Sequence, residues 1–261
     1  MLKKTYYYRN LIWSFVVRDL QGRYVGSTMG IFWSLINPVI TLLLYLYVFS
    51  AILKVKFGQN GSLTDFALYL FCGMLPWLAF QETVIRSTNS IVENANLIKK
   101  FMFPSKILTV YLSISSLVNE LIGLVVLIIA INLITHKISY FILFLPVIII
   151  FQLTFTMGLG WIFACVNVFF RDTAHLIGVI MMVWMFLTPI FYPESMIPQK
   201  FHLIIKINPM AYLVRAYRDI LLNEKLPHIS DILIFMAISI IVFFGGYYLF
   251  SKTQHQFSDI V

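Results

Sequence analysis

The feature that most constrains this sequence is residues 138–170, a largely apolar run without a single Asp, Glu, Lys or Arg. A helix needs about 20 apolar residues to cross the hydrocarbon core of a bilayer, which is roughly 30 Å thick, and this run exceeds that length. Only 11% of the chain is charged and 60% is hydrophobic, whereas average soluble domains are about 25% charged. Lipid must therefore surround most of the chain, which excludes a soluble enzyme, a disordered tail and a secreted disulfide scaffold.

Five further apolar runs accompany this one, and helices suit them because a barrel strand needs only roughly ten residues. We predict one all-α polytopic membrane domain over residues 1–261, with six transmembrane helices at 31–53, 66–85, 107–134, 140–168, 174–192 and 231–251. An even number of spans places both termini on one side. That side carries eleven basic residues and the other carries eight, of which five lie between spans five and six. Without those five the bias is strong, so we expect both termini to be cytoplasmic.

Residues 1–30 are predicted to hold an amphipathic helix lying on the inner leaflet. Its polar face carries Asn10, Ser14, Arg18 and Gln21, and its apolar face includes Ile12 and Phe15. Asp19 falls on the apolar side and breaks the pattern. The apolar run 11–17 is too short for a signal peptide and leads directly into Arg18 and Asp19, so we expect an interfacial helix.

Residues 193–223 divide at prolines into two pieces that are each too short to cross a bilayer, 199–208 and 210–223. In the second piece Leu213, Tyr217 and Leu221 share one face, whereas Arg215 and Arg218 point elsewhere, which is typical of an amphipathic helix. The stretch is either an ordinary extracellular loop with helical turns or a re-entrant helical hairpin at the outer mouth of a pore. The apolar spacing favours the hairpin.

Residues 88–105 form a second segment that is helical and partly apolar without spanning the membrane. Ser90 and Glu93 have the spacing of a capping box. The residues that follow place an apolar stripe beside two lysines and end in a proline: Leu97, Ile98, Phe101, Lys99, Lys100 and Pro104. This surface either docks into a groove on a partner protein or packs against the protein's own interface.

Several kinds of chemistry have no motif in this sequence. It has no Gly-x-x-x-x-Gly-Lys phosphate loop, so it cannot bind a nucleotide in the Walker manner, and no basic cluster stands apart from the apolar runs to indicate a nucleic-acid partner. Cys72 and Cys165 lie inside apolar runs and are expected to be buried thiols. Glu120 is the one carboxyl group deep in a span, where it either binds a proton or forms a structural hydrogen bond between helices. Glu82 and Arg86 are spaced to pair on one helix.

Several local patterns together resemble ABC-2-type permeases that export polysaccharides, a family that includes O-antigen, capsule and teichoic-acid transporters. The first is Arg18-Asp19-Leu20-x-x-Arg23-Tyr24-x-x-Ser27-x-x-Gly30-x-x-Trp33-x-x-x-x-Pro38. The others follow in the family's order: Phe101-Met-Phe-Pro104, Phe170-Arg-Asp172, Thr188-Pro-Ile-Phe-Tyr-Pro193, Asn208-Pro209 and Arg218.

The resemblance implies a homodimer in the bacterial cytoplasmic (inner) membrane that works with two copies of a separate nucleotide-binding ATPase subunit. The partner, and not this chain, would bind ATP and magnesium. The cargo would be a polysaccharide on a polyprenyl diphosphate lipid. Residues 88–105 would be a coupling segment that contacts the ATPase through Glu93, Leu97, Ile98, Phe101, Phe103 and Pro104. We expect the lipid diphosphate to meet Arg18, Arg23, Lys99 and Lys100. The outer gate would comprise Pro193, Pro198, Asn208, Pro209, Tyr212, Arg215 and Arg218.

Two other functions compete with this one. A secondary carrier would use Glu120 as its proton site and would transport with this chain alone. A membrane-embedded sugar transferase acting on lipid-linked substrates would need clustered carboxylates to hold a metal at the membrane face, and the sequence shows only isolated ones. The transporter subunit fits the sequence best.

Overall fold

A computed structural model describes residues 8–23, 26, 29–52, 63–100, 103–136 and 139–260 of the chain. Over these residues the chain is helical and contains no strand, which confirms the predicted all-α class. The main helices are α2 (Arg9–Gly22), α3 (Trp33–Tyr45), α4 (Leu63–Glu93), α5 (Ala95–Lys100), α6 (Lys106–Thr135), α7 (Leu145–Phe169), α8 (Thr173–Leu187), α9 (His202–Ile207), α10 (Pro209–Leu221), α11 (Ile229–Thr253) and α12 (Phe257–Ile260).

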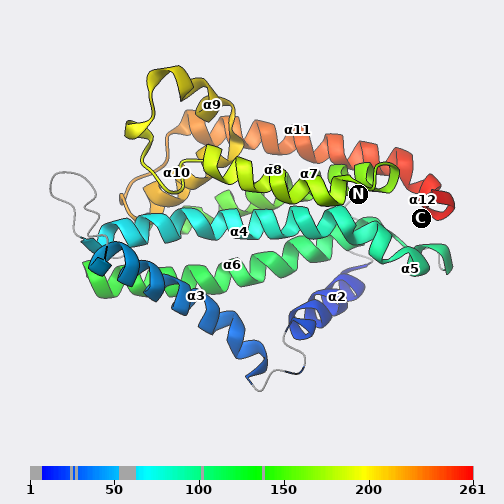
Figure 1. Cartoon of the computed structure of the whole chain (residues 1–261), viewed down its shortest axis with the longest axis horizontal. Helices are drawn as coiled ribbons and strands as arrows, with labels where there is room; N and C mark the ends of the chain where they lie inside the picture. The colour runs from blue at the N-terminus through cyan, green and yellow to red at the C-terminus, as the bar shows by residue number, and fades with distance from the viewer. Residues whose placement is uncertain are drawn as a thin grey trace.

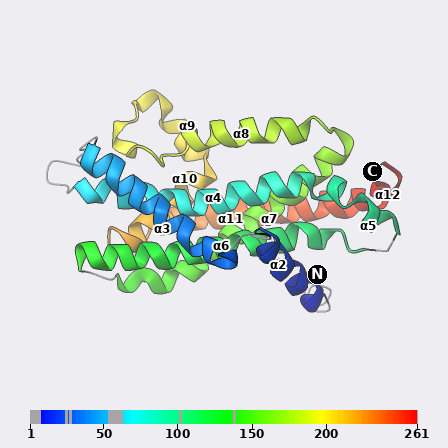
Figure 2. The same cartoon turned by 60° about the horizontal axis from the view of Figure 1, so that its bottom comes forward.

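Short helical turns connect or extend these helices. A π-helical stretch, η2 (Leu46–Ile52), continues α3, and 3₁₀ turns lie at η1 (Gly30–Phe32), η3 (Tyr140–Phe144), η4 (Glu194–Met196), η5 (Gln199–Phe201) and η6 (Gln254–Gln256). In Figure 1, α4, α6, α7, α8 and α11 run along the long axis and α3 crosses them obliquely. The α9–α10 region lies at one end of the bundle, and α5 and α12 lie at the other (Figures 1 and 2).

Four helical stretches of the described chain are long and apolar enough to cross a membrane: Asp65–Glu93, Lys106–Thr135, Tyr140–Phe169 and Ile229–Gln256. Two further apolar helices, Trp33–Val48 and Thr173–Leu187, are shorter. All six overlap the six predicted runs. The α8 helix ends before the predicted limit at residue 192, because Thr188 precedes Pro189 and takes an extended conformation.

The α4 helix is longer than the sequence suggested, and this corrects the predicted capping box. Ser90 lies inside α4 and not at a helix start, and its hydroxyl donates to the Ser87 carbonyl oxygen. The chain turns only at Asn94, because no proline or glycine interrupts the helix between Pro76 and that point.

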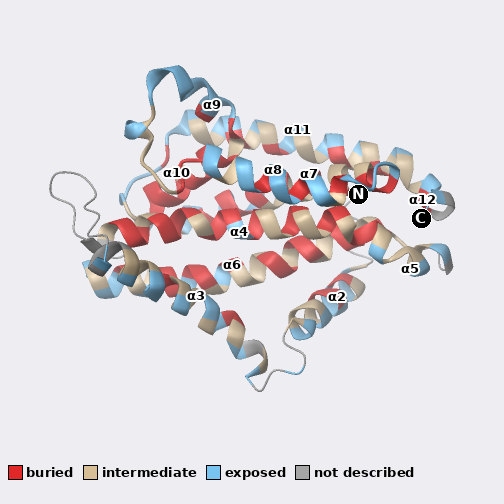
Figure 3. Cartoon of the chain, viewed as in Figure 1, coloured by how far each residue is buried: buried red, intermediate tan, exposed pale blue. Residues whose placement is uncertain are grey.

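The core follows α4, which is largely buried, as is α10, whereas α3, α8 and α11 expose much of their surface (Figure 3). Trp77 and Phe80 of α4 pack against Trp184 of α8 with ring centroids 6.2 and 5.2 Å apart, and Phe80 stacks on Phe155 of α7 at 5.6 Å. The exposed apolar residues of the outer helices suit a lipid environment, in which an apolar exterior carries no penalty.

Candidate functional site

A cluster of charged side chains holds α2 against α4 and α6. Asp19 pairs with Arg23, one turn away at 3.1 Å, and with Arg86 of α4, and it accepts a hydrogen bond from Ser115 of α6. Glu82 completes the cluster with contacts of 2.6 Å to Arg23 and 3.1 Å to Arg86, so the predicted Glu82–Arg86 pair is confirmed. Burial alone would raise the pKa of Asp19, but the hydrogen bonds from Arg86 and Ser115 and the charges of Arg86 and Arg23 hold this pKa below its usual 3.8. Asp19, which breaks the amphipathic pattern, is thus the residue that anchors the helix.

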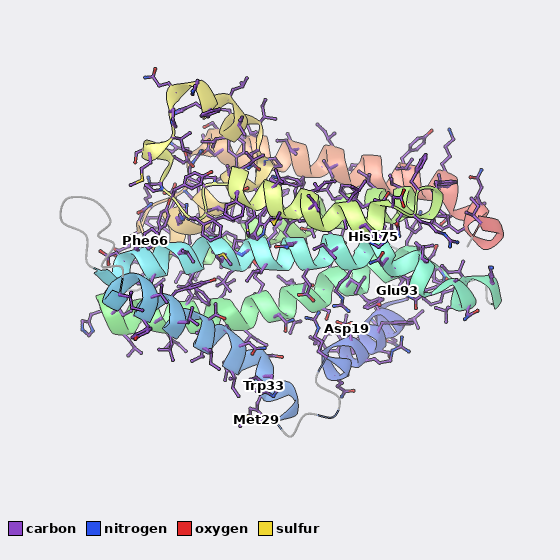
Figure 4. The ribbon with its side chains drawn as sticks, in the orientation of Figure 1. Asp19, Met29, Trp33, Phe66, Glu93 and His175 are labelled. Carbon is purple, nitrogen blue, oxygen red and sulfur yellow. The ribbon has the colours of Figure 1, made fainter. Side chains whose placement is uncertain are left out.

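The two faces predicted for the N-terminal helix are present in α2. Ile12, Phe15 and Val16 are buried, and the polar face is exposed at Asn10, Ser14, Arg18 and Gln21. In Figure 4, α2 with Asp19 lies beside the bundle near the end of α4 that carries Glu93, far from Phe66.

A cavity of about 370 Å³ lies beside this cluster, and it contains two of the four basic residues predicted to meet a diphosphate. Its walls are formed by Phe15, Arg18, Asp19, Gly22, Arg23, Arg86 and Tyr111. Arg18 is exposed and places its guanidinium 4.5 Å from the centre of the Phe15 ring, and no carboxylate of the described chain pairs with it. Lys99 is exposed on α5 and does not line this cavity, and the side chain of Lys100 lies outside the described residues.

The predicted coupling segment divides into a buried and an exposed part. Ile98 and Phe103 pack against an internal cluster that includes Ile91 of α4 and Phe257 of α12. Glu93 and Lys99 are exposed, Leu97 and Pro104 are half-buried, and Phe101 lies outside the described residues. One side of the segment therefore packs on its own chain, as one alternative expected, and the other side faces outward.

The α10 helix buries two charged side chains inside the protein. The α10 helix does not expose a polar face to water, because Arg218 and Asp219 are 6% and 3% exposed. Arg218 donates to the carbonyl oxygens of Pro189 at 2.6 Å and Ile190 at 2.8 Å, and its guanidinium carbon lies 3.3 Å from the centre of the Tyr69 ring. Other segments of the chain cover the side of the helix that carries these two charges.

Asn208 and Pro209 form the start of α10, and an Asn followed by a Pro is typical of a helix N-terminus. The Asn208 side chain accepts from the Met210 backbone amide at 3.0 Å, and Pro209 occupies the first helical position, where no amide hydrogen is needed. Asn208 also accepts from the Trp184 indole at 2.8 Å and donates to the Thr188 hydroxyl at 2.9 Å, which ties α10 to the end of α8.

Tyr212 and Arg215 bond α10 to the segments around it. The Tyr212 hydroxyl donates to the Lys206 carbonyl oxygen at 2.6 Å, which joins α10 to α9. Arg215 pairs with Glu194 at 2.8 Å and with Asp231 of α11. Pro193 and Pro198 precede the turns η4 and η5 in extended conformations.

The sequence interpretation missed the partners of Glu120. Gln152 of α7 and Tyr217 of α10 both contact its carboxyl group inside the bundle. The available signal was Gln152 itself, a polar residue in the middle of an uncharged run, but nothing in the sequence links it to a position 65 residues away on α10. Both cysteines are buried as expected.

The sequence pattern of the ABC-2 type transporter family matches residues 10–222 of this chain. The chain is 28% identical over 263 residues to the O-antigen export system permease protein RfbA of Myxococcus xanthus, covering 100% of this chain and 99% of that protein. It is 30% identical over 250 residues to the protein of the same name from Klebsiella pneumoniae, covering 94% and 92%. The polysialic acid transport protein KpsM of Escherichia coli is 23% identical over 207 residues, which is 78% of each chain.

Proposed function

Because this chain belongs to the ABC-2 type transporter family, we propose that it is the membrane permease subunit of an ATP-driven exporter of lipid-linked polysaccharide. The observation that carries the proposal is the similarity to O-antigen export permeases along nearly the full length of both proteins. A bundle of long apolar helices is the architecture that such a subunit needs. The same similarity favours this function over a secondary carrier or a sugar transferase.

The proposal includes an assembly of two copies of this chain with two ATPase subunits in the bacterial inner membrane. Six apolar helices, α3, α4, α6, α7, α8 and α11, each cross the membrane in it, with both ends of the chain in the cytoplasm. The α5 end of the bundle then faces the ATPase, and the α9–α10 end forms the outer gate. ATP and magnesium bind to the ATPase subunits, and their hydrolysis of ATP drives the permease.

The lipid diphosphate meets this chain at the cavity beside α2. Arg18 supports this placement, because it is an exposed cation on the wall of a cavity that also contains Arg23 and Arg86. Compact anions bind cations strongly through charge-assisted hydrogen bonds. Arg23 and Arg86 already pair with carboxylates, so Arg18 is the group available to a new anion.

Co-purification with an ATP-binding subunit tests the assembly. The full-length chain is expected to hydrolyse no ATP by itself and to retain the ATPase through α5. Leu97→Asp adds a charge at a half-buried position of this helix and is expected to abolish co-purification, whereas Leu203→Asp, at an exposed position of α9 at the other end, leaves it intact. If both variants retain the ATPase equally, α5 is not part of the interface. ATP hydrolysis by this chain alone would contradict the assignment of hydrolysis to a separate subunit.

A further inference from the structure

Three side chains from three helices meet deep inside the bundle. They are Glu120 of α6, Gln152 of α7 and Tyr217 of α10, with exposed fractions of 3%, 3% and 0%. The Tyr217 hydroxyl oxygen lies 2.6 Å from one Glu120 carboxyl oxygen and 2.7 Å from the Gln152 amide oxygen. The Gln152 amide nitrogen lies 2.8 Å from the other Glu120 oxygen and 3.3 Å from the Pro76 carbonyl oxygen.

A count of hydrogens decides the protonation state of this group. Each of the four contacts needs one hydrogen between its two polar atoms. The Gln152 amide supplies two and the Tyr217 hydroxyl supplies one, while an ionised carboxylate supplies none. One of the two short contacts of Tyr217 would then join two oxygen atoms with no hydrogen between them, and a buried contact of that kind is repulsive. A protonated Glu120 supplies the missing hydrogen.

The orientation of the Gln152 amide does not change this result. If its nitrogen and oxygen are exchanged, the nitrogen donates to Tyr217 and Tyr217 donates to Glu120. The Gln152 oxygen then faces the second Glu120 oxygen at 2.8 Å, which again requires a hydrogen on the carboxyl group.

We infer that Glu120 is a proton-binding site whose neutral acid form joins α10 to α6 and α7. Its proton donates to Tyr217, the hydroxyl of Tyr217 donates to Gln152, and the amide of Gln152 donates back to Glu120. Loss of that proton removes one of the bonds that hold α10. This role is independent of what the chain transports.

No cation opposes the neutral form among the described residues. The ionisable side chains on elements that pack against α6 or α10 are Arg9, Arg18 and Asp19 of α2 with Arg23 directly after it, Tyr45 of α3, Asp65, Tyr69, Cys72, Glu82, Arg86 and Glu93 of α4, Cys165 of α7, Tyr140 of η3, His202 and Lys206 of α9, and Asp231, Tyr247, Tyr248 and Lys252 of α11; α6 itself has Lys106 and Tyr111, and α10 has Tyr212, Arg215, Tyr217, Arg218 and Asp219. Of these, Tyr217 is the group that bonds to Glu120, and the nearby arginines bond elsewhere: Arg23 to Glu82, and Arg218 to backbone carbonyl oxygens.

A cavity of about 270 Å³ is lined both by Glu120 and by two members of the charged cluster, Arg23 and Glu82. Its other walls combine apolar residues of α3 and α4 with five polar residues, Ser34, Asn37, Thr41, Ser116 and Asn119. The Ser34 and Ser116 hydroxyls and the Asn119 amide oxygen are buried without a partner in the described chain, so each can bond to water. Water along these groups gives the Glu120 proton a route of exchange toward Arg23.

Infrared spectroscopy of the full-length chain in lipid nanodiscs tests the protonation state directly. At neutral pH the wild type is expected to show the C=O stretching band of one protonated carboxyl group per chain, and Glu120→Gln is expected to lack it. The band is expected to shift promptly in heavy water because the cavity admits solvent. A spectrum with only carboxylate bands would overturn the proton site, and a band that does not respond to heavy water would overturn the route.

Thermal unfolding tests whether the proton holds α10. Glu120→Gln keeps a group that can donate to Tyr217 and is expected to melt near the wild type, whereas Glu120→Ala melts well below it. The wild type is expected to lose stability relative to Glu120→Gln as the pH rises, because only its carboxyl group can ionise. If Glu120→Gln and Glu120→Ala lower the melting temperature equally, the group acts as an anion. The same holds if the wild type becomes more stable relative to Glu120→Gln as the pH rises.

Discussion

At the scale of single residues, one arginine is buried without an opposite charge among the described residues to pair with it. This residue is Arg218, because carbonyl oxygens and an aromatic ring surround its guanidinium in place of a carboxylate. Pro189 helps to supply those carbonyl groups, since it ends α8 and leaves the carbonyl groups of residues 189 and 190 free of helical bonds. A buried cation of this kind is strongly destabilising when its partners are lost.

Gly73 of α4 packs against Arg218, so a larger side chain at this position is expected to disturb the site. A Cβ atom there would lie 2.8 Å from an Arg218 guanidinium nitrogen and 3.2 Å from a Val214 methyl carbon. Gly73→Ala is expected to reduce the free energy of unfolding by about 1–3 kcal/mol, as overpacking does elsewhere. Gly178→Ala, with no atom within 4 Å, is the control and is expected to leave stability unchanged or slightly raised. Thermal melting in nanodiscs measures both, and indistinguishable melting points would contradict the packing described.

Sequence patterns predicted the charged residues of this site but not their surroundings. Glu120 is visible as a carboxyl group inside an apolar run, and Arg218 as a charge on a short helix between prolines. Their partners are far away in the chain, at Tyr217 and Tyr69 respectively, and a helical wheel describes only one helix at a time. It assigns each polar face to water because it contains no information on what another segment covers.

At the scale of elements, α7 and α11 approach each other closely at two glycines. A Cβ atom on Gly158 would lie 2.6 Å from the Val242 carbonyl oxygen, and one on Gly246 would lie 2.2 Å from the Gly158 carbonyl oxygen. Small residues allow backbones to approach in this way, and the resulting packing stabilises helices in lipid, where no hydrophobic effect drives them together.

Gly246→Ala is therefore expected to separate α11 from α7. Both backbones must move to admit the methyl group, so the free energy of unfolding is expected to fall by roughly 2 kcal/mol or more. Gly245→Ala, at the adjacent position and with open space around its Cβ, provides the matched control and is expected to behave as the wild type. Melting curves of the two variants in the same lipid check this, and an equal loss of stability in both would show that the loss does not arise from the contact between Gly246 and Gly158.

The existence of the helices was predictable because the length of an apolar run carries its own physical meaning in a bilayer. The residues at which the helices begin and end were less predictable. The α8 helix is shorter than its apolar run because Thr188 precedes a proline, and α4 is longer than its apolar run because polar residues from Ser87 to Glu93 continue the helix. Hydropathy locates apolar residues, whereas the hydrogen-bonded helix continues until a residue breaks it.

At the scale of the whole molecule, the two ends of the bundle differ in kind. One end holds α5 and α12 with the exposed Lys99 and Lys252, and the other holds α9 and α10 (Figure 1). The proposed function requires the first end to be cytoplasmic and the second to be outside. The outer end has basic residues of its own, but Arg215 and Arg218 are bonded within the protein and so do not act as free positive charges.

Cysteine labelling in intact cells tests this orientation. Lys206→Cys on α9 is expected to react with a membrane-impermeant maleimide, whereas Lys252→Cys on α11 reacts only after the membrane is permeabilised, since both positions are exposed. Cys72 and Cys165 are buried and serve as an unreactive background. The reverse labelling pattern would invert the topology and with it the assignment of α5 to the ATPase.

The burial of α10 also has a consequence for the order in which the protein is made. The side chains and carbonyl groups that Tyr217 and Arg218 bond to belong to residues 69, 120, 152, 189 and 190, all of which precede α10 in the chain. During synthesis the docking site is therefore complete before α10 emerges. Arg218, which would be costly to insert into lipid alone, can therefore bond to its partners as soon as it leaves the ribosome and translocon. Glu120, in contrast, is synthesised long before Tyr217, and until then its neutral acid form is the one that lipid tolerates.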